Sequence, residues 1–132
     1  MDTGVLISAF AFGGVPEKAV NKAFAEADIY VSPTLLKEYR DVPLELEAEE
    51  KIDHVQLKAL VSGIAAFVTK VKIVQPEKKV TICRDPEDNM ILECCFKAGV
   101  TFLITGDRDL LDIKDMPSKL KIVTPQKYLE EG

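Results

Sequence analysis

The chain has 132 residues, of which 47% are hydrophobic, so we expect residues 1–132 to form one domain around a single core. A net charge of −5 argues against binding nucleic acid by bulk electrostatics, although bound cations can invert the local charge. One histidine is too few for a multi-histidine zinc or iron site within one chain. No apolar run of about 18 residues is present and no signal peptide is visible, so we expect no membrane span, a cytoplasmic location and reduced cysteines.

Helical and strand patterns alternate along the first half of the chain. The predicted elements are a helix from Pro16 to Ala27, a strand at 29–31, a helix from Pro33 to about Val42, and a long helix from His54 to about Lys70. Before them, residues 5–7 fit either a strand or a helix capped by Asp2 or Thr3. Pro43 is expected to restart the chain into the acidic run at 45–50, which we interpret as a solvated helix face.

The second half continues the alternation, with clear signals at helix ends. Asp85 is a predicted N-cap, Pro86 fits the first helical position, and Gly99 fits the left-handed residue that ends a helix. The predicted elements are strands at 71–74, 100–104 and 121–123, a helix from Pro86 to Ala98, and a short helix after Pro125. This alternation predicts a three-layer α/β fold with a mostly parallel sheet.

Carboxylates stand at several of these element junctions, namely Asp2, Glu38, Asp88 and Asp107, flanked by Asp85 and Asp109. Each alone has a structural explanation as a cap, a turn residue or an exposed helix residue. Together they would repel one another unless protonated or joined by a cation. Oxygen ligands suit Mg²⁺ or Mn²⁺, which also bind substrate phosphate, so the pattern indicates hydrolysis of a phosphodiester.

Four of these segments, in order, resemble the motifs of PIN domains: Asp2–Ala9, Ser32–Glu38, Asp85–Ile91 and Thr105–Leu111. The resemblance spans nearly the whole chain and is closest to the toxin components of toxin–antitoxin pairs. It implies a PIN-like fold with a sheet of about five strands and an Mg²⁺- or Mn²⁺-dependent endoribonuclease. The partners it implies are an RNA substrate, an antitoxin protein and a second copy in a homodimer.

Carried over by position, the resemblance implies that Asp2, Glu38, Asp88 and Asp107 are the catalytic metal ligands. Asp109 and Asp85 would be supporting carboxylates, and Thr105 would hold the family's hydroxyl position beside the site. Basic residues adjoining the motifs are candidate contacts to RNA phosphate, with solvated surface charge as the alternative reading: Arg84, Arg108, Lys37 and Arg40.

The sequence departs from the family pattern at two places. Gly4 stands where the family usually has asparagine, so a side chain that could orient the site is missing. The family's first strand lies ahead of the first aspartate, where only Met1 stands here, so we expect a truncated first strand and a helix over 5–9. Such a stub would expose strand edges, and the nearby α-amino group would weaken cation binding at Asp2.

Two other functions fit parts of the sequence. Asp2–Leu6 and Gly106-Asp107 superficially resemble motifs of haloacid-dehalogenase-like phosphatases, but the second aspartate of the opening motif, its strand and a suitable lysine are missing. The other alternative is a non-catalytic PIN-fold module that binds RNA, an antitoxin or another protein, because a fold does not fix a function.

Overall fold

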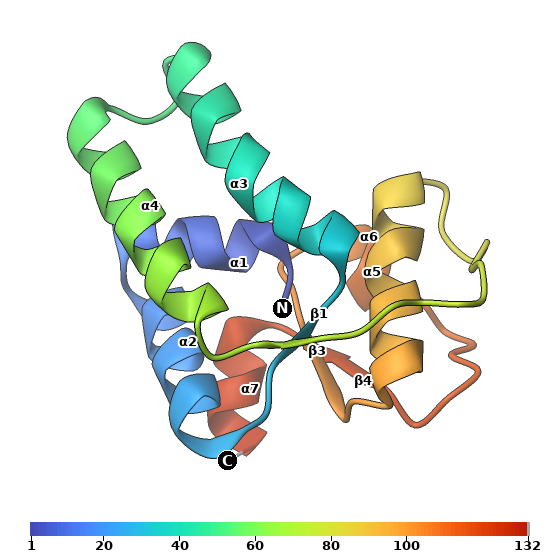
Figure 1. The fold of residues 1–132 in the computed structure, drawn as a ribbon. Coiled ribbons are helices and arrows are strands. Elements are labelled where there is room, and N and C mark those ends of the chain that lie inside the picture. Colours follow the sequence, from blue (N-terminus) through green and yellow to red (C-terminus); the bar gives the residue numbers. More distant parts are fainter. Residues whose placement is uncertain (132) are drawn as a thin grey trace.

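A computed structural model describes residues 1–131 of the chain (Figure 1). The helices are α1 (Thr3–Ile7), α2 (Val15–Glu26), α3 (Pro33–Ala48), α4 (His54–Val68), α5 (Pro86–Ala98), α6 (Arg108–Leu111) and α7 (Pro125–Glu131), with a π-helical turn η1 (Ser8–Phe12) after α1. The strands are β1 (Tyr30–Val31), β2 (Lys72–Ile73), β3 (Phe102–Ile104) and β4 (Lys121–Val123). Among these residues no helix is long and apolar enough to cross a membrane.

The strands form two separate parallel pairs. Tyr30 of β1 lies opposite Lys72 of β2, and Phe102 of β3 lies opposite Lys121 of β4. Within residues 1–131 no ladder joins the two pairs, so the expected continuous sheet of about five strands is not formed. The chain enters α1 at Thr3, which settles the ambiguity at residues 5–7 in favour of a helix.

Helix α3 differs from its prediction because it continues through Pro43 to Ala48. Pro43 removes one backbone donor, which costs roughly 3 kcal/mol in an isolated helix interior. Here Pro43 is fully buried and α3 packs along α4, so tertiary packing offsets the lost bond. The prediction of a chain restart at Pro43 was therefore wrong, whereas the predicted helix face in the acidic run is confirmed as far as Ala48.

The predicted helix ends agree better with the structure. Ser32 Oγ accepts the backbone N–H of Leu35 at 3.2 Å. Asp53 and Gln56 form a reciprocal capping box at the start of α4. Gly99 ends α5 with a φ of 66°, the left-handed conformation that glycine adopts without a steric penalty.

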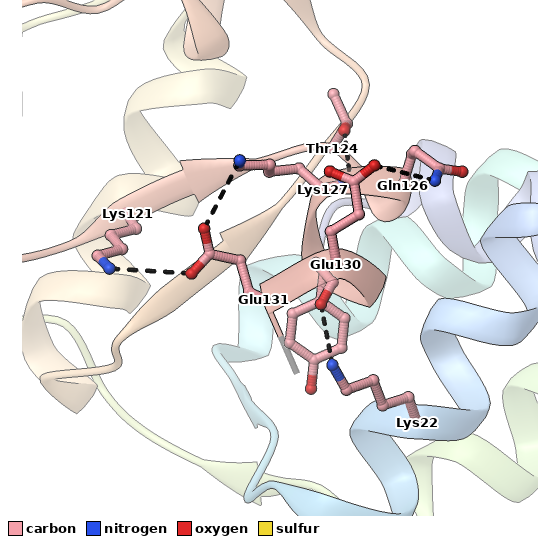
Figure 2. Close-up of polar contacts among 8 residues, drawn as sticks. Lys22, Lys121, Thr124, Gln126, Lys127, Glu130 and Glu131 are labelled. Atoms are coloured by element: carbon pink, nitrogen blue, oxygen red, sulfur yellow. Dashed lines mark hydrogen bonds and ion pairs between the residues drawn. The ribbon is translucent and has the colours of Figure 1, made fainter.

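Helices pack around the strands and share one core. Phe67 of α4 is fully buried, with its ring centroid 5.1 Å from that of Phe24 and 5.9 Å from that of Tyr39. Helix α5 contacts β1, while α7 contacts β4 and α2. Figure 2 shows how α7 is held: Lys22 donates to the Tyr128 carbonyl at 3.0 Å, and Glu131 pairs with lysines of β4 and α7.

Candidate metal centre

Three aspartates from two segments converge at the start of α5 and the end of β3. Asp88, Asp107 and Asp109 each offer a carboxylate oxygen, and these oxygens lie within 4.8 Å of one another. Asp85 and Pro86 start α5 and so place Asp88 in its first turn, while Asp107 caps α6 by accepting the Asp109 N–H at 2.9 Å. The local caps therefore fix two of the three carboxylates directly.

Asp88 is the buried member of this cluster, with 6% of its surface exposed. Burial, followed by the negative charge of Asp107, raises the pKa of Asp88 to about 7. The charges of Asp85 and Asp2 raise this pKa further. At neutral pH the cluster is thus poised to exchange a proton for a cation.

Thr105 joins Asp2 to the same site. Its fully buried hydroxyl donates to Asp2 Oδ2 at 2.5 Å and accepts the Asp107 N–H at 3.0 Å. The Asp2 N–H also donates to the Ile104 carbonyl at 3.0 Å. Through one hydroxyl, the first acidic residue of the chain is held beside the last motif.

Glu38 extends from α3, and its two carboxylate oxygens differ in their hydrogen bonding. Thr3 donates its hydroxyl to Glu38 Oε1 at 2.7 Å, whereas Oε2 is buried without a hydrogen-bond partner among residues 1–131. Burial raises the pKa of Glu38, and the charges of Glu87, Asp2 and Asp85 raise it further, although the Thr3 hydrogen bond opposes the shift. A buried carboxylate oxygen without a partner is costly unless a proton, water or cation meets it.

Comparison with known proteins identifies the family. The profile of the PIN domain matches residues 1–109, which include every acidic residue of the candidate metal centre. The chain belongs to the PIN domain family. It is also 29% identical over 140 residues to the uncharacterized protein MJ1680 of Methanocaldococcus jannaschii, in a match that covers 99% of this chain and 88% of the relative. No solved structure matches the chain significantly.

PIN domains are generally nucleases, so the family assignment confirms the resemblance seen in the four motifs. Two members of this PIN domain's acidic site were missed in the sequence. Thr3 is buried and holds Glu38, and Glu87 of α5 acts electrostatically on Glu38. Their only sequence signal is adjacency, since each lies next to a predicted ligand.

Gly4 lies in α1, where an added Cβ would meet no atom within 4 Å. A side chain at this position would therefore begin in open space.

The basic candidates are distributed around the site, and only one touches the aspartate cluster. Arg84 lies 3.5 Å from Asp109, whereas Arg108 pairs with Asp112 at 3.5 Å and Arg40 with Asp41 at 2.9 Å. Lys37 is exposed on α3. In this structure the last three residues are solvated surface charges.

The donor set fits a hard divalent cation. The three candidate ligands, Asp88, Asp107 and Asp109, are all carboxylates. Asp88 and Glu38 both have a raised pKa that a cation would lower. Cys83 lies nearby, but burial and the surrounding carboxylates raise the pKa of its thiol, which disfavours the thiolate that a soft metal needs. The cluster is thus compatible with an ion such as Mg²⁺ or Mn²⁺.

Proposed function

We propose that this PIN domain is a ribonuclease that depends on Mg²⁺ or Mn²⁺ and hydrolyses phosphodiester bonds in single-stranded RNA. The observation that carries the proposal is the convergence of Asp2, Asp88 and Asp107 from three distant parts of the chain. These residues come together although repulsion opposes it, and the raised pKa of Asp88 reflects both that repulsion and burial. A divalent cation relieves the repulsion.

In the proposed site, Asp88, Asp107 and Asp109 hold the cation, with Asp2 supplying a further oxygen beside them. When bound, the ion supplies Lewis-acid chemistry and activates a water molecule for attack on phosphorus. Thr105 orients Asp2 through its hydroxyl. Glu38 offers its unpartnered Oε2 to a cation, directly or through water, or to a proton from the attacking water.

Arg84 is the best placed of the proposed RNA contacts. The Arg84 side chain is 91% exposed, and its guanidinium contacts the cluster through Asp109 at 3.5 Å. An exposed pair of this kind contributes little to stability, so the guanidinium is free to exchange Asp109 for a phosphate oxygen.

The test is cleavage of a labelled single-stranded RNA in Mn²⁺, comparing the wild-type chain with Asp88→Asn and Asp107→Asn. Asp112→Asn is the matched control, because Asp112 is also an acidic residue near α6 but pairs only with exposed Arg108. We expect EDTA to abolish cleavage, both site variants to lose at least about 100-fold in rate, and the control to match the wild type.

The alternatives predict different results in the same assay. A phosphatase would release phosphate from a phosphomonoester and leave the RNA intact. A binding module would retain RNA or protein binding without cleavage. Cleavage that persists unchanged in Asp88→Asn and Asp107→Asn would show that the activity does not come from this site.

A further inference from the structure

The segment 74–85, which joins β2 to α5, is held by side chains of α5. All of its residues are described, and none of them lies in a helix or a strand. Asn89 Oδ1 accepts the Cys83 N–H at 2.7 Å, and Asn89 Nδ2 donates to the Cys83 carbonyl at 3.0 Å. Both backbone polar groups of Cys83 are thus bonded to one amide, the type of side chain that offers a donor and an acceptor together.

Two more side chains of α5 continue this contact along the helix. Glu93 Oε2 accepts the Val80 N–H at 2.9 Å, and Lys97 Nζ lies 2.9 Å from Glu77 Oε1. The three side chains of α5 are spaced by four residues and so share one face of the helix. Their partners occur in reverse order along the chain, so residues 77–83 run back beside α5 towards its first turn (Figure 1).

The amide of Asn89 connects two parts of the acidic site. Along α5, Asn89 directly follows Asp88, the buried member of the aspartate cluster. Across the contact it holds Cys83, which directly precedes Arg84, and the Arg84 guanidinium lies 3.5 Å from Asp109. Because the Arg84 side chain is 91% exposed, packing restrains it little, and its position depends on the backbone that carries it.

We propose that Asn89 is a positioning residue, which holds the Cys83 backbone so that Arg84 stays at the rim of the aspartate cluster and meets a phosphate of bound RNA. This inference rests on the proposed nuclease function. Asn89 acts through Cys83 and needs no contact of its own with RNA. A guanidinium whose backbone is held in place before RNA arrives loses less conformational entropy on binding.

Other bonds hold both ends of this stretch when the Asn89 amide is removed. Val80 stays bonded to Glu93, and Asp85 still caps α5. Asn89→Ala should therefore loosen the few residues between Val80 and Asp85 without unfolding the domain. The far-ultraviolet circular dichroism of this variant should match that of the wild type.

The first measurement is NMR of the cation-free protein in EDTA, which needs neither RNA nor activity. In Asn89→Ala we expect the Cys83 amide to exchange roughly tenfold faster or more, and the order parameter of the Arg84 amide to fall from about 0.85 to about 0.6 or below. The Val80 amide should not change, because its own bond remains. Asn21→Ala, the same chemical change at an exposed position of α2, is the control and should match the wild type.

The second measurement is a double-mutant cycle on the affinity for a labelled single-stranded RNA, measured by fluorescence anisotropy in Ca²⁺. We expect Arg84→Ala to weaken binding about tenfold, Asn89→Ala to weaken it about threefold or more, and Asn21→Ala to leave it unchanged. In the Arg84→Ala background, Asn89→Ala should have no further effect, because the amide then has no guanidinium to position. A merely structural role of Asn89 would weaken binding in both backgrounds.

Two results would overturn the positioning role of Asn89. One is an Arg84 amide that stays as ordered in Asn89→Ala as in the wild type, and the other is an equal loss of RNA affinity in both backgrounds. No RNA binding by the wild type in Ca²⁺ would instead overturn the proposed function and, with it, the phosphate contact of Arg84. The NMR result would then still decide whether Asn89 holds Arg84 in place.

Discussion

At the scale of single residues, Asp88 links folding to cation binding. Its pKa of about 7 in the folded chain lies well above the ordinary value of 3.8. Between these values the folded state keeps a proton that the unfolded state has released. Stability therefore falls as pH rises through this interval, which is opposite to the usual behaviour of a salt-bridged aspartate.

This direction of the pH dependence of stability leads to a prediction for the metal-free protein. In EDTA, Tm of the wild type should fall between about pH 4 and pH 7, and Asp88→Asn should flatten that fall because it removes the main titrating group. The raised pKa of Glu38 has the same sign, so some dependence should remain. The measurement is thermal unfolding by circular dichroism across this pH range; a variant profile parallel to that of the wild type would contradict the assignment.

A second prediction concerns Thr105, whose single hydroxyl forms hydrogen bonds with residues of two motifs. Thr105→Val keeps the shape but leaves Asp2 Oδ2 without its donor and the Asp107 N–H without its acceptor. We expect a loss of about 1–2 kcal/mol in urea unfolding, because buried groups lose their partners, and a weaker affinity for Mn²⁺. Thr101→Val, at an exposed position, is the control and should change neither quantity.

At the scale of elements, the contact between α4 and η1 depends on Gly63, which has no side chain. A Cβ on Gly63 of α4 would overlap the ring of Phe10, whereas a Cβ on Gly4 of α1 would meet nothing within 4 Å. Both glycines are helical, so alanine raises the helix propensity at either position by up to about 1 kcal/mol.

These positions form a matched pair for urea unfolding. Gly63→Ala should destabilise the chain by about 1–3 kcal/mol, because the ring of Phe10 must move in a packed core. Gly4→Ala should be neutral or stabilising by roughly 0.5 kcal/mol. Equal effects of the two substitutions would mean that Phe10 repacks freely around α4.

Sequence patterns predicted the helix ends well because caps are local. Each cap acts within four residues of itself, so its role can be predicted from the residue types alone. The caps concerned are Ser32, Asp53, Asp85 and Gly99. The continuation of α3 through Pro43 was missed because it depends on packing against α4, which is tertiary. Thr3 was missed for the same reason, since its partner Glu38 is 35 residues away.

At the scale of the whole molecule, the net charge of −5 repels RNA. We therefore expect RNA to bind only at the candidate metal centre. At about 150 mM salt, we expect no measurable binding of single-stranded RNA in EDTA by fluorescence anisotropy. Ca²⁺, used in place of Mn²⁺ to limit cleavage, should restore binding in the wild type and much less in Asp107→Asn. Equal binding in EDTA and Ca²⁺ would place the RNA surface away from the carboxylates.

The two strand pairs and the acidic site meet at Asp2, whose backbone pairs with β3 and whose side chain reaches Thr105. The arrangement of the strands therefore determines how firmly one side of the candidate metal centre is held. The segments that supply Asp88 and Asp107 are anchored independently, by the caps of α5 and α6.

The most direct test of the cation site is calorimetric titration of Mn²⁺ into the wild type, Asp88→Asn and Asp112→Asn at about pH 7.5. Because the cation displaces the fraction of a proton that the Asp88 cluster still holds at this pH, we expect binding in the wild type and in Asp112→Asn, with an observed heat that varies with the ionisation enthalpy of the buffer. Asp88→Asn should bind at least tenfold more weakly. Equal affinities for all three proteins would contradict the central claim that Asp88, Asp107 and Asp109 form a cation site.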